Sequence, residues 1–119
     1  MLQNEQVGGK VLARPAKLRF LECLPGSKLF GPMGMPAKDL ERLRVSFDEL
    51  EALRLIHIER TTQAEAGRRL GVSGSTVSRM AARAHRLITE ALVAGKALCV
   101  EGGPVTVGQV EERSDKENE

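Results

Sequence analysis

The chain has 119 residues, about one domain, and its 18 basic and 16 acidic residues give a formal net charge of +2. Only 3% of the residues are aromatic and none is Trp or Tyr, which disfavours a protein that stacks single-stranded bases. No stretch approaches about 18 consecutive apolar residues, and the first residues lack the basic and apolar regions of a signal peptide. We therefore expect a cytoplasmic protein with no membrane partner.

The near-neutral total charge conceals a basic body and an acidic end. Residues 10–99 carry 16 basic and 9 acidic side chains, whereas residues 101–119 carry 2 basic and 6 acidic ones. Between residues 66 and 89 there are five arginines and no acidic residue. Clustered arginine on one face is typical of a surface that binds a polyanion, and an ordinary solvated helix face is the alternative.

The N-terminal part of the chain predicts little regular structure. Residues 1–12 show no apolar periodicity, and we expect a disordered lead-in. Residues 13–45 begin with a basic arm, continue as a short strand over 17–24 and then enter a loop.

The expected loop covers residues 25–36, which contain three Pro and three Gly. We expect Phe30 and Met33 to anchor this loop to the core. Residues 43–46 are consistent with a second short strand.

A helical domain is expected over residues 46–96. Ser46 followed by Glu49 is a capping box, which predicts the start of a helix. The apolar residues of 47–58 spread around much of the helix, so we expect burial on more than one side, against a helical unit and also against the strands or a second subunit. His57 falls on an apolar face, which favours a core or boundary histidine over a metal ligand.

A second helix follows. Thr62 repeats the capping box with Glu65, and the helix over 63–70 is expected to end at Gly71, which suits the left-handed conformation past a helix end.

A third, long helix begins after Ser73, a favourable N-cap, and is expected to continue to Ala94 with Gly95 as its stop. At about 1.5 Å per residue it is roughly 30 Å long. Its apolar residues recur with helical periodicity and should face inward. They are Val77, Met80, Ala81, Ala84, Leu87, Ile88, Ala91 and Leu92.

The chain is expected to end in a short strand over 97–103 and a disordered acidic tail over 104–119. Cys23 and Cys99 both fall on expected strands that could pair with each other. Reduced thiols that act as small hydrophobic groups are favoured over a redox-sensing disulfide. We expect no metal site, because two cysteines at this spacing supply too few ligands.

Residues 62–86 have the pattern of a helix-turn-helix. Ala66 and Gly67 permit a close helix crossing, Gly71 suits the sharp turn, and Val72 supplies an apolar plug. The expected fold is therefore mainly α, a helix-turn-helix with a small β element formed by short N- and C-terminal strands. An ordinary helical hairpin is the alternative, but it does not require an arginine-bearing outer face.

The outer face of the long helix carries small hydroxyl groups followed by arginines. This pattern suits a recognition helix in the major groove of double-stranded DNA, and we expect Ser75, Ser78 and Arg79 to reach base edges. The free backbone N–H groups at the helix start favour a phosphate. The other expected DNA-binding residues of this unit are Ser73, Gly74, Thr76, Arg68, Arg69, Arg83 and Arg86, with simple solvation as the alternative for Thr76 and Arg86.

The basic arm is a second candidate for DNA contact. Arg14, Lys17 and Arg19 surround a proline that stiffens the chain, and arms of this kind lie in minor grooves or along phosphates. An inert linker is the alternative.

A series of short motifs occurs in order along the chain. The motifs are Ala-Arg-Pro-x-Lys (13–17), Leu-Pro (24–25), Leu-Phe-Gly-Pro-x-Gly-x-Pro (29–36), Asp-Glu-Leu-Glu-Ala-Leu-Arg-Leu (48–55), Gln-Ala-Glu-Ala (63–66), Leu-Gly-Val-Ser (70–73) and Gly-Lys-Ala-Leu-x-Val-Glu-Gly-Gly (95–103). Together they resemble a small prokaryotic family of uncharacterised, predicted DNA-binding proteins. The resemblance implies a helix-turn-helix similar to region four of sigma factors and an activity of the transcription-regulator type. Gly67 stands where members usually have Ala, and Gly74 replaces a longer, often basic residue.

The sequence thus predicts a transcriptional regulator that binds double-stranded DNA as a homodimer or higher homo-oligomer. The alternative is an adaptor that uses the same fold to dock on a transcription component, with little DNA affinity. We expect no enzymatic activity and no cofactor, because no nucleophile–base pair, phosphate-binding loop or metal cluster is evident.

Overall fold

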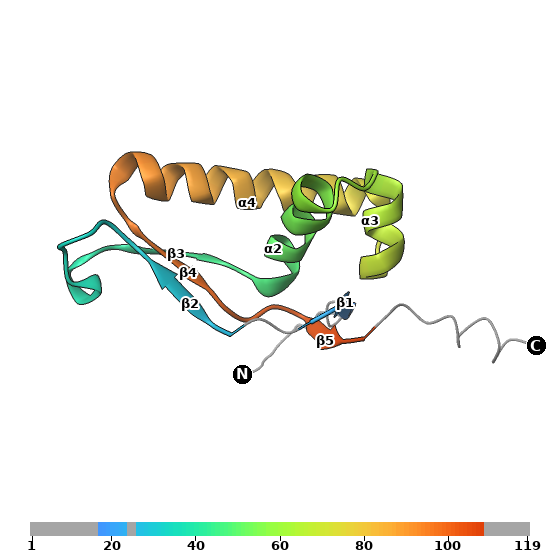
Figure 1. The fold of residues 1–119 in the computed structure, drawn as a ribbon, viewed down its shortest axis with the longest axis horizontal. Coiled ribbons are helices and arrows are strands. Elements are labelled where there is room, and N and C mark those ends of the chain that lie inside the picture. The colour runs from blue at the N-terminus through green and yellow to red at the C-terminus, as the bar shows by residue number, and fades with distance from the viewer. Residues whose placement is uncertain (1–16, 24–25, 109–119) are drawn as a thin grey trace, which may run out of the picture.

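The computed structural model describes residues 17–23 and 26–108 (Figure 1). The expected lead-in, the part of the acidic tail beyond Gly108, and Arg14 lie outside the described residues. Within the described part, no helix has the length and apolarity needed to cross a membrane.

The helices form one layer of the molecule. They are α2 (Phe47–Leu53), a π-helical turn η2 (Arg54–Ile58), α3 (Gln63–Leu70) and α4 (Gly74–Ala94). The long helix α4 extends across the whole layer, and α2 and α3 both pack against it (Figure 1). A short 3₁₀ turn, η1 (Ala37–Asp39), lies before them in the chain.

Local capping determines where these helices begin and end. At Ser46 the capping box is complete, because the hydroxyl accepts from the Glu49 N–H and the Glu49 carboxylate accepts from the Ser46 N–H. The hydroxyl of Thr62 likewise accepts a hydrogen bond from the Glu65 N–H and caps α3. The expected return bond from the Thr62 N–H to the Glu65 carboxylate was wrong, since that carboxylate binds Arg68 instead. The left-handed glycines expected after α3 and α4 are confirmed, with φ of 86° at Gly71 and 71° at Gly95.

Short strands form the second layer. β1 (Arg19–Leu21) pairs in parallel with β5 (Val105–Val107). In a three-stranded sheet, β4 (Ala97–Val100) is central, antiparallel to β2 (Lys28–Phe30) and parallel to β3 (Arg42–Val45).

Two expectations about the β structure were wrong. β2 occupies residues 28–30, inside the expected loop, and β5 occupies residues 105–107, inside the expected tail. Both segments are short, and each is paired with a strand distant in the chain, so local residue patterns do not reveal them. The strands that carry or precede the cysteines also do not pair with each other, because β1 pairs with β5 and not with β4.

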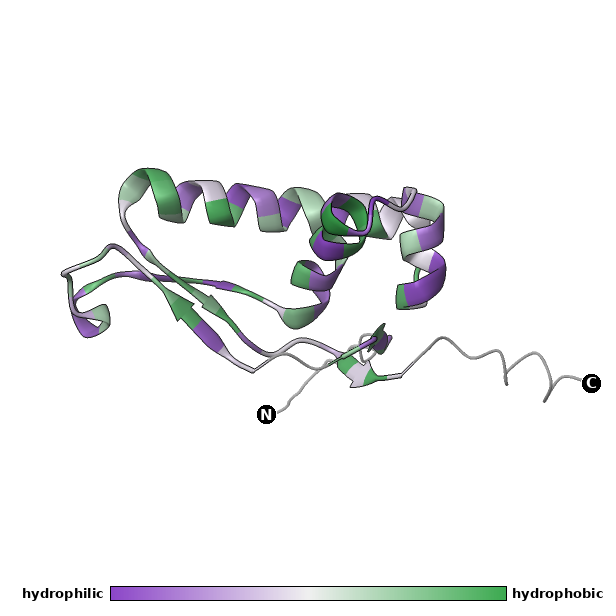
Figure 2. Cartoon of the chain, viewed as in Figure 1, coloured by the Kyte–Doolittle hydropathy of each residue, from purple (hydrophilic) through white to green (hydrophobic). Residues whose placement is uncertain are grey.

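The apolar interior consists of two adjoining clusters. The first fills the space among α2, η2, α3 and the first half of α4, and the second joins α4 to β3. Hydrophobic and hydrophilic residues alternate in bands along α4, as its amphipathic pattern requires (Figure 2). The clusters are Ala52, Leu55, Ala66, Leu70, Val77 and Met80, and Val45, Leu53, Ala81, Ala84 and Leu87.

Several side chains that were expected to be buried or partly buried are exposed to solvent. Phe30 and Met33 are 55% and 98% exposed and so do not anchor the loop to the core. Leu92 is 79% exposed although Ala91 in the same turn of α4 is buried, because consecutive residues lie about 100° apart around a helix and Leu92 is at the edge of the apolar face. His57 is exposed too, and its ring lies 5.0 Å from the ring of His85 on α4.

Candidate nucleic-acid interface

The turn between α3 and α4 is tight because the backbone folds back onto the C-terminal half of α3. The N–H groups of Gly71 and Val72 both donate to the carbonyl oxygen of Gly67, at 2.7 and 2.9 Å. A Cβ at Gly67 would lie 2.5 Å from the carbonyl oxygen of Val72. Glycine at this position therefore permits the close approach that sets α3 against the start of α4.

Hydroxyl groups organise the first turn of α4. Ser73 accepts a hydrogen bond from the N–H of Thr76 at 3.1 Å and donates to its hydroxyl at 3.0 Å. The hydroxyl of Ser75 lies 3.1 Å from that of Ser73. At Gly74 a Cβ would be in ordinary contact, 3.6 Å from Gln63, so this position has room for a side chain.

Arg79 lies one turn further along the same helix. Its Nη2 donates to the hydroxyl of Thr76 at 3.1 Å, and no carboxylate among the described residues pairs with it. Ser75, Ser78 and Arg79 are all exposed. The three side chains expected to reach base edges are thus uncovered on the first two turns of α4.

The other two arginines of α4 are paired with carboxylates. Arg83 donates to both carboxylate oxygens of Glu49 at 2.8 and 2.7 Å, although its own side chain is 52% exposed. Arg86 lies 3.7 Å from Glu90, one turn further along the helix. Arg86 and Glu90 are four positions apart on one helix, a spacing that the sequence shows directly. Arg83 and Glu49 are 34 positions apart, so the sequence does not indicate that pair.

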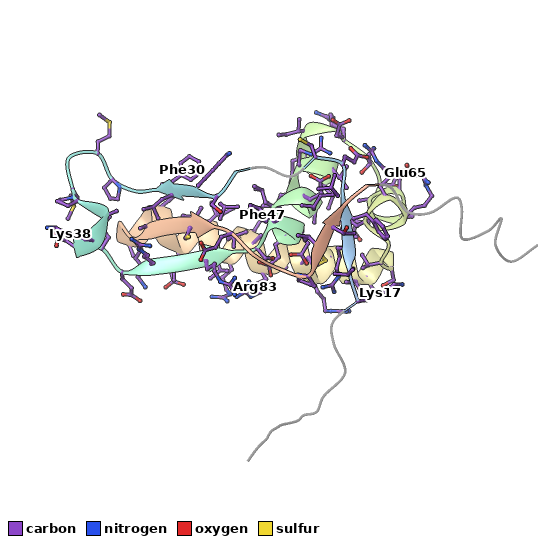
Figure 3. All side chains as sticks on the ribbon, turned by 90° about the horizontal axis from the view of Figure 1, so that it is seen from below. Lys17, Phe30, Lys38, Phe47, Glu65 and Arg83 are labelled. Carbon is purple, nitrogen blue, oxygen red and sulfur yellow. The ribbon has the colours of Figure 1, made fainter. Side chains whose placement is uncertain are left out.

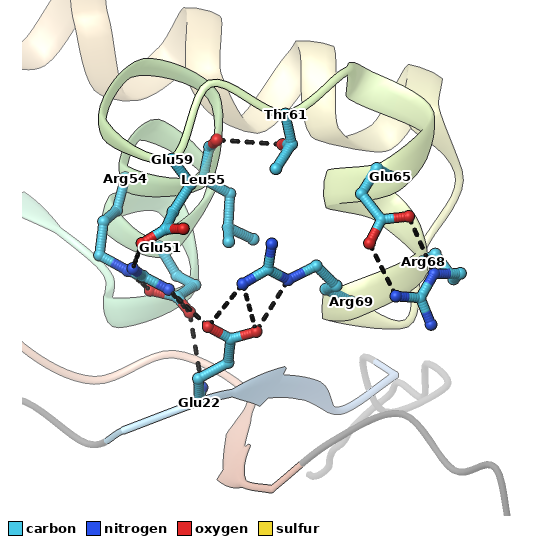
Figure 4. Close-up of polar contacts among 9 residues, drawn as sticks. All are labelled: Glu22, Glu51, Arg54, Leu55, Glu59, Thr61, Glu65, Arg68 and Arg69. Carbon is cyan, nitrogen blue, oxygen red and sulfur yellow. Dashed lines mark hydrogen bonds and ion pairs between the residues drawn. The ribbon is translucent and has the colours of Figure 1, made fainter.

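The arginines of α3 are paired as well. Arg68 donates to both oxygens of Glu65, at 3.0 and 2.7 Å. Arg69 is directed toward β1, where its Nε and Nη2 each bind Glu22 at 2.8 Å (Figure 4). Protein carboxylates therefore reduce the positive charge that was expected on α3. The ion pair of Arg69 with Glu22 also links α3 to the end of β1.

Glu22 is the centre of a network that sequence reasoning missed (Figure 4). It accepts from Arg69 and also from Nη2 of Arg54 at 2.8 Å, and Arg54 in turn binds Glu51 at 2.8 Å. Partial burial raises the pKa of Glu22, but the hydrogen bonds from Arg69 and Arg54 outweigh it and lower the pKa overall. Hydrogen bonding to Glu51 raises the pKa of Arg54. The network attaches β1 to η2 and α3.

Only part of the expected basic arm is available to a ligand. Lys17 is exposed beside β1 (Figure 3). Arg19 instead lies half-buried against α2, where Nη1 pairs with Asp48 at 3.4 Å. Arg19 lies against the protein because β1 packs against the N-terminal part of α2.

The two cysteines are free, Cys23 exposed and Cys99 half-buried on β4. Burial raises the pKa of the Cys99 thiol, so a smaller fraction of it is ionised to the reactive thiolate. Within the part of the chain that the structure describes, no three His, Cys, Asp or Glu side chains converge as metal ligands.

Comparison with known proteins identifies relatives but no function. The chain is 42% identical over 92 residues to a UPF0251 protein of Halothermothrix orenii, which covers 77% of this chain and 68% of the relative. It is 38% identical over 104 residues to a UPF0251 protein of Prosthecochloris aestuarii, with coverage of 87% and 64%. A UPF0251 protein of Chlorobaculum tepidum is 41% identical over 93 residues, with coverage of 78% and 61%. The chain thus spans about two thirds of the length of these relatives.

No solved structure matches the chain. One family model matches residues 10–107, which is most of the chain and includes all of the helices described above. The expected resemblance to a family of uncharacterised proteins is confirmed: the chain belongs to the family described as protein of unknown function DUF134.

Proposed function

We propose that this protein binds double-stranded DNA in a sequence-specific manner and regulates transcription. In this proposal α3 and α4 form a helix-turn-helix unit similar to region four of sigma factors, and the first half of α4 enters the major groove. The observation that carries the proposal is the exposed group of Ser75, Ser78 and Arg79 at the start of α4, directly after the tight turn.

The position of these side chains supports base contact. Residues near the N-terminus of a recognition helix are the ones that meet base edges. No carboxylate among the described residues pairs with Arg79, so its guanidinium has N–H groups available for bidentate contact with guanine O6 and N7. The hydrogen bond from Arg79 to Thr76 limits the orientations of that guanidinium before DNA arrives, which lowers the entropy lost on binding.

Arg83 and Arg86 suit phosphate contact rather than base reading. Both are exposed and further along α4, and each exchanges a carboxylate for a phosphate in the proposed complex. Arg86 and Glu90 are both exposed, so that exchange costs little, whereas the Glu49 side chain is only 12% exposed and its loss of Arg83 costs more.

The pairing of Arg68, Arg69 and Arg83 with protein carboxylates favours a second candidate, an adaptor that docks on a transcription component. A surface whose charge is already balanced attracts DNA less strongly. The two candidates differ in what they bind, so a DNA-binding measurement separates them.

The test is selection of bound fragments from random duplex DNA, followed by affinity measurements over a salt series. We expect a defined motif, and a slope of log affinity against log salt of about −4 to −5, corresponding to about five phosphates. Enrichment of no motif, with no detectable binding at low salt, would overturn the proposal and favour the adaptor.

A further inference from the structure

An apolar surface lies at the end of α4 opposite Ser73. Four large apolar side chains, from β2, the turn after it and the last turn of α4, are exposed there. We call this the apolar end surface, and its residues are Phe30 (55% exposed), Met33 (98%), Met35 (52%) and Leu92 (79%).

A groove of about 400 Å³ runs through this surface. One wall of the groove comes from β2 and the turn that follows it, and the other comes from α4. The turn lies close to the end of the helix, because a Cβ added at Gly95 would lie 3.9 Å from Cγ of Pro32. The lining is almost entirely apolar. It includes Phe30, Pro32, Ile88, Ala91, Leu92 and Leu98.

The one charged residue in the groove lining is already neutralised. Nζ of Lys96 lies 2.7 Å from Glu90 and 3.4 Å from Glu41. An occupant therefore needs apolar side chains and no counter-charge. The chain's own C-terminal residues 109–119 are mostly charged and do not suit such a groove.

The exposed area approaches one partner's share of a protein–protein interface. The exposed fractions of the four residues are together equivalent to nearly three whole side chains. At roughly 150–200 Å² for a large apolar side chain, this is on the order of 500 Å², compared with about 800 Å² per partner in a standard interface. Monomeric proteins rarely expose contiguous apolar patches larger than a few hundred Å².

We propose that the occupant is a second copy of this chain, which packs the same surface about a two-fold axis. In the dimer, the protruding Met33 of each protomer enters the groove of its partner and contacts Phe30 there. A two-fold arrangement makes both contacts equivalent, so the same surface supplies both the projecting Met33 and the groove that receives the partner's Met33. Methionine suits this role because its unbranched thioether adapts to irregular apolar grooves and packs well against aromatic rings.

The location agrees with the proposed function, on which this step rests. α4 has 21 residues, and at about 1.5 Å per residue its two ends are roughly 30 Å apart. Joining two copies at their C-terminal ends leaves both N-terminal ends free and permits them to reach successive major grooves about 34 Å apart. Phe30 and Arg83 lie on opposite edges of the molecule in Figure 3, so the dimer contact leaves Arg83 uncovered.

The test is the mass of the full-length protein in solution, without DNA, at concentrations of about 1 to 100 µM. We expect the wild type to be a dimer that persists in 1 M salt, since apolar contacts are not screened. Met33→Glu and Leu92→Glu should each give a folded monomer, because both side chains are largely exposed within one protomer. The matched control is Ile58→Glu, which changes an exposed apolar residue (74%) outside the surface and should remain dimeric.

A wild type that stays monomeric at the highest concentration overturns the inference and leaves the groove to a different protein. A dimer that survives both substitutions also overturns it. On duplexes with two half-sites, Met33→Glu should lose affinity on the order of a hundredfold, while binding to one half-site remains. A dimer that binds no DNA contradicts only the proposed function, and a monomer that binds DNA contradicts only the dimer surface.

Discussion

The guanidinium of Arg83 on α4 donates to both carboxylate oxygens of Glu49, the residue that completes the capping box of α2. One carboxylate thus caps a helix and neutralises an arginine of the proposed DNA-binding face. The capping role needs only an oxygen acceptor, whereas the neutralisation needs a negative charge. The two roles can therefore be separated by substitution.

Glu49→Gln separates them. Glutamine retains the hydrogen bond to the Ser46 N–H, so we expect the melting temperature to change little. Arg83 becomes free for phosphate, and affinity for duplex DNA should rise about three- to tenfold, equivalent to about 1 kcal/mol. Titration of labelled duplex measures the affinity, and Glu49→Gln combined with Arg83→Ala should abolish the gain. Unchanged affinity in the single variant would contradict a phosphate role for Arg83.

Arg79→Ala should relax sequence preference. Loss of the guanidinium at the start of α4 removes about 1–3 kcal/mol of discrimination between the selected site and unrelated duplexes. Competition between the two duplexes measures this difference directly. The matched control is Arg86→Ala on the same helix, which should weaken binding to both duplexes equally and reduce the salt slope by about 1. Equal, uniform losses from both variants would refute the separate roles.

Glu22→Gln should loosen the attachment of β1 to η2 and α3. Glu22 is partly exposed, so we expect a loss of about 1 kcal/mol in the free energy of unfolding at neutral pH. Because the pKa of Glu22 is lowered in the folded state, its contribution is fully present above the unfolded pKa of about 4.3 and disappears as pH falls through the folded pKa. Urea unfolding over a pH series should show the wild type and the variant differing at pH 7, with the difference shrinking as the pH falls below about 4.3.

The control for this variant is Glu65→Gln, which removes a carboxylate that pairs with Arg68 on the surface of the same helix. It should change the free energy of unfolding by less than Glu22→Gln, since it joins no separate elements. If both variants behave alike, the network around Glu22 has no special role in holding β1.

Gly71→Ala should destabilise the turn between α3 and α4. The φ of 86° at Gly71 is unfavourable for any residue with a Cβ, and we expect a loss of about 1–2 kcal/mol, measured by thermal or urea unfolding. Gly26→Ala is the control, because Gly26 is outside the left-handed region and nothing lies within 4 Å of an added methyl group. Equal stability of the two variants would contradict the turn geometry.

The beginnings and ends of the helices were determined by local sequence. Ser46, Ser73, Gly71 and Gly95 were all assigned correctly, because a cap depends on hydrogen bonds and dihedral angles within a few residues. The inward face of α4 was also predictable as far as Ala91, since helical periodicity places these residues on one side.

The ion pairs that join distant segments were decided only by tertiary structure. Glu22 and Arg69 are 47 positions apart, and Glu49 and Arg83 are 34 apart, so no local spacing indicates either pair. These pairs change the electrostatics of the candidate site, and the sequence alone left the arginines as free charges.

Tertiary structure also decided how wide the covered side of α4 is and which strands pair. A periodic pattern states which side of a helix is apolar, but not how much of that side is covered, so Ala91 is buried whereas Leu92, at the edge of the apolar face, is 79% exposed. The pairing of β1 with β5 joins the two ends of the described chain, and its register is set by backbone hydrogen bonds. Backbone groups are the same in every residue, so the sequence carries no direct record of such a partner.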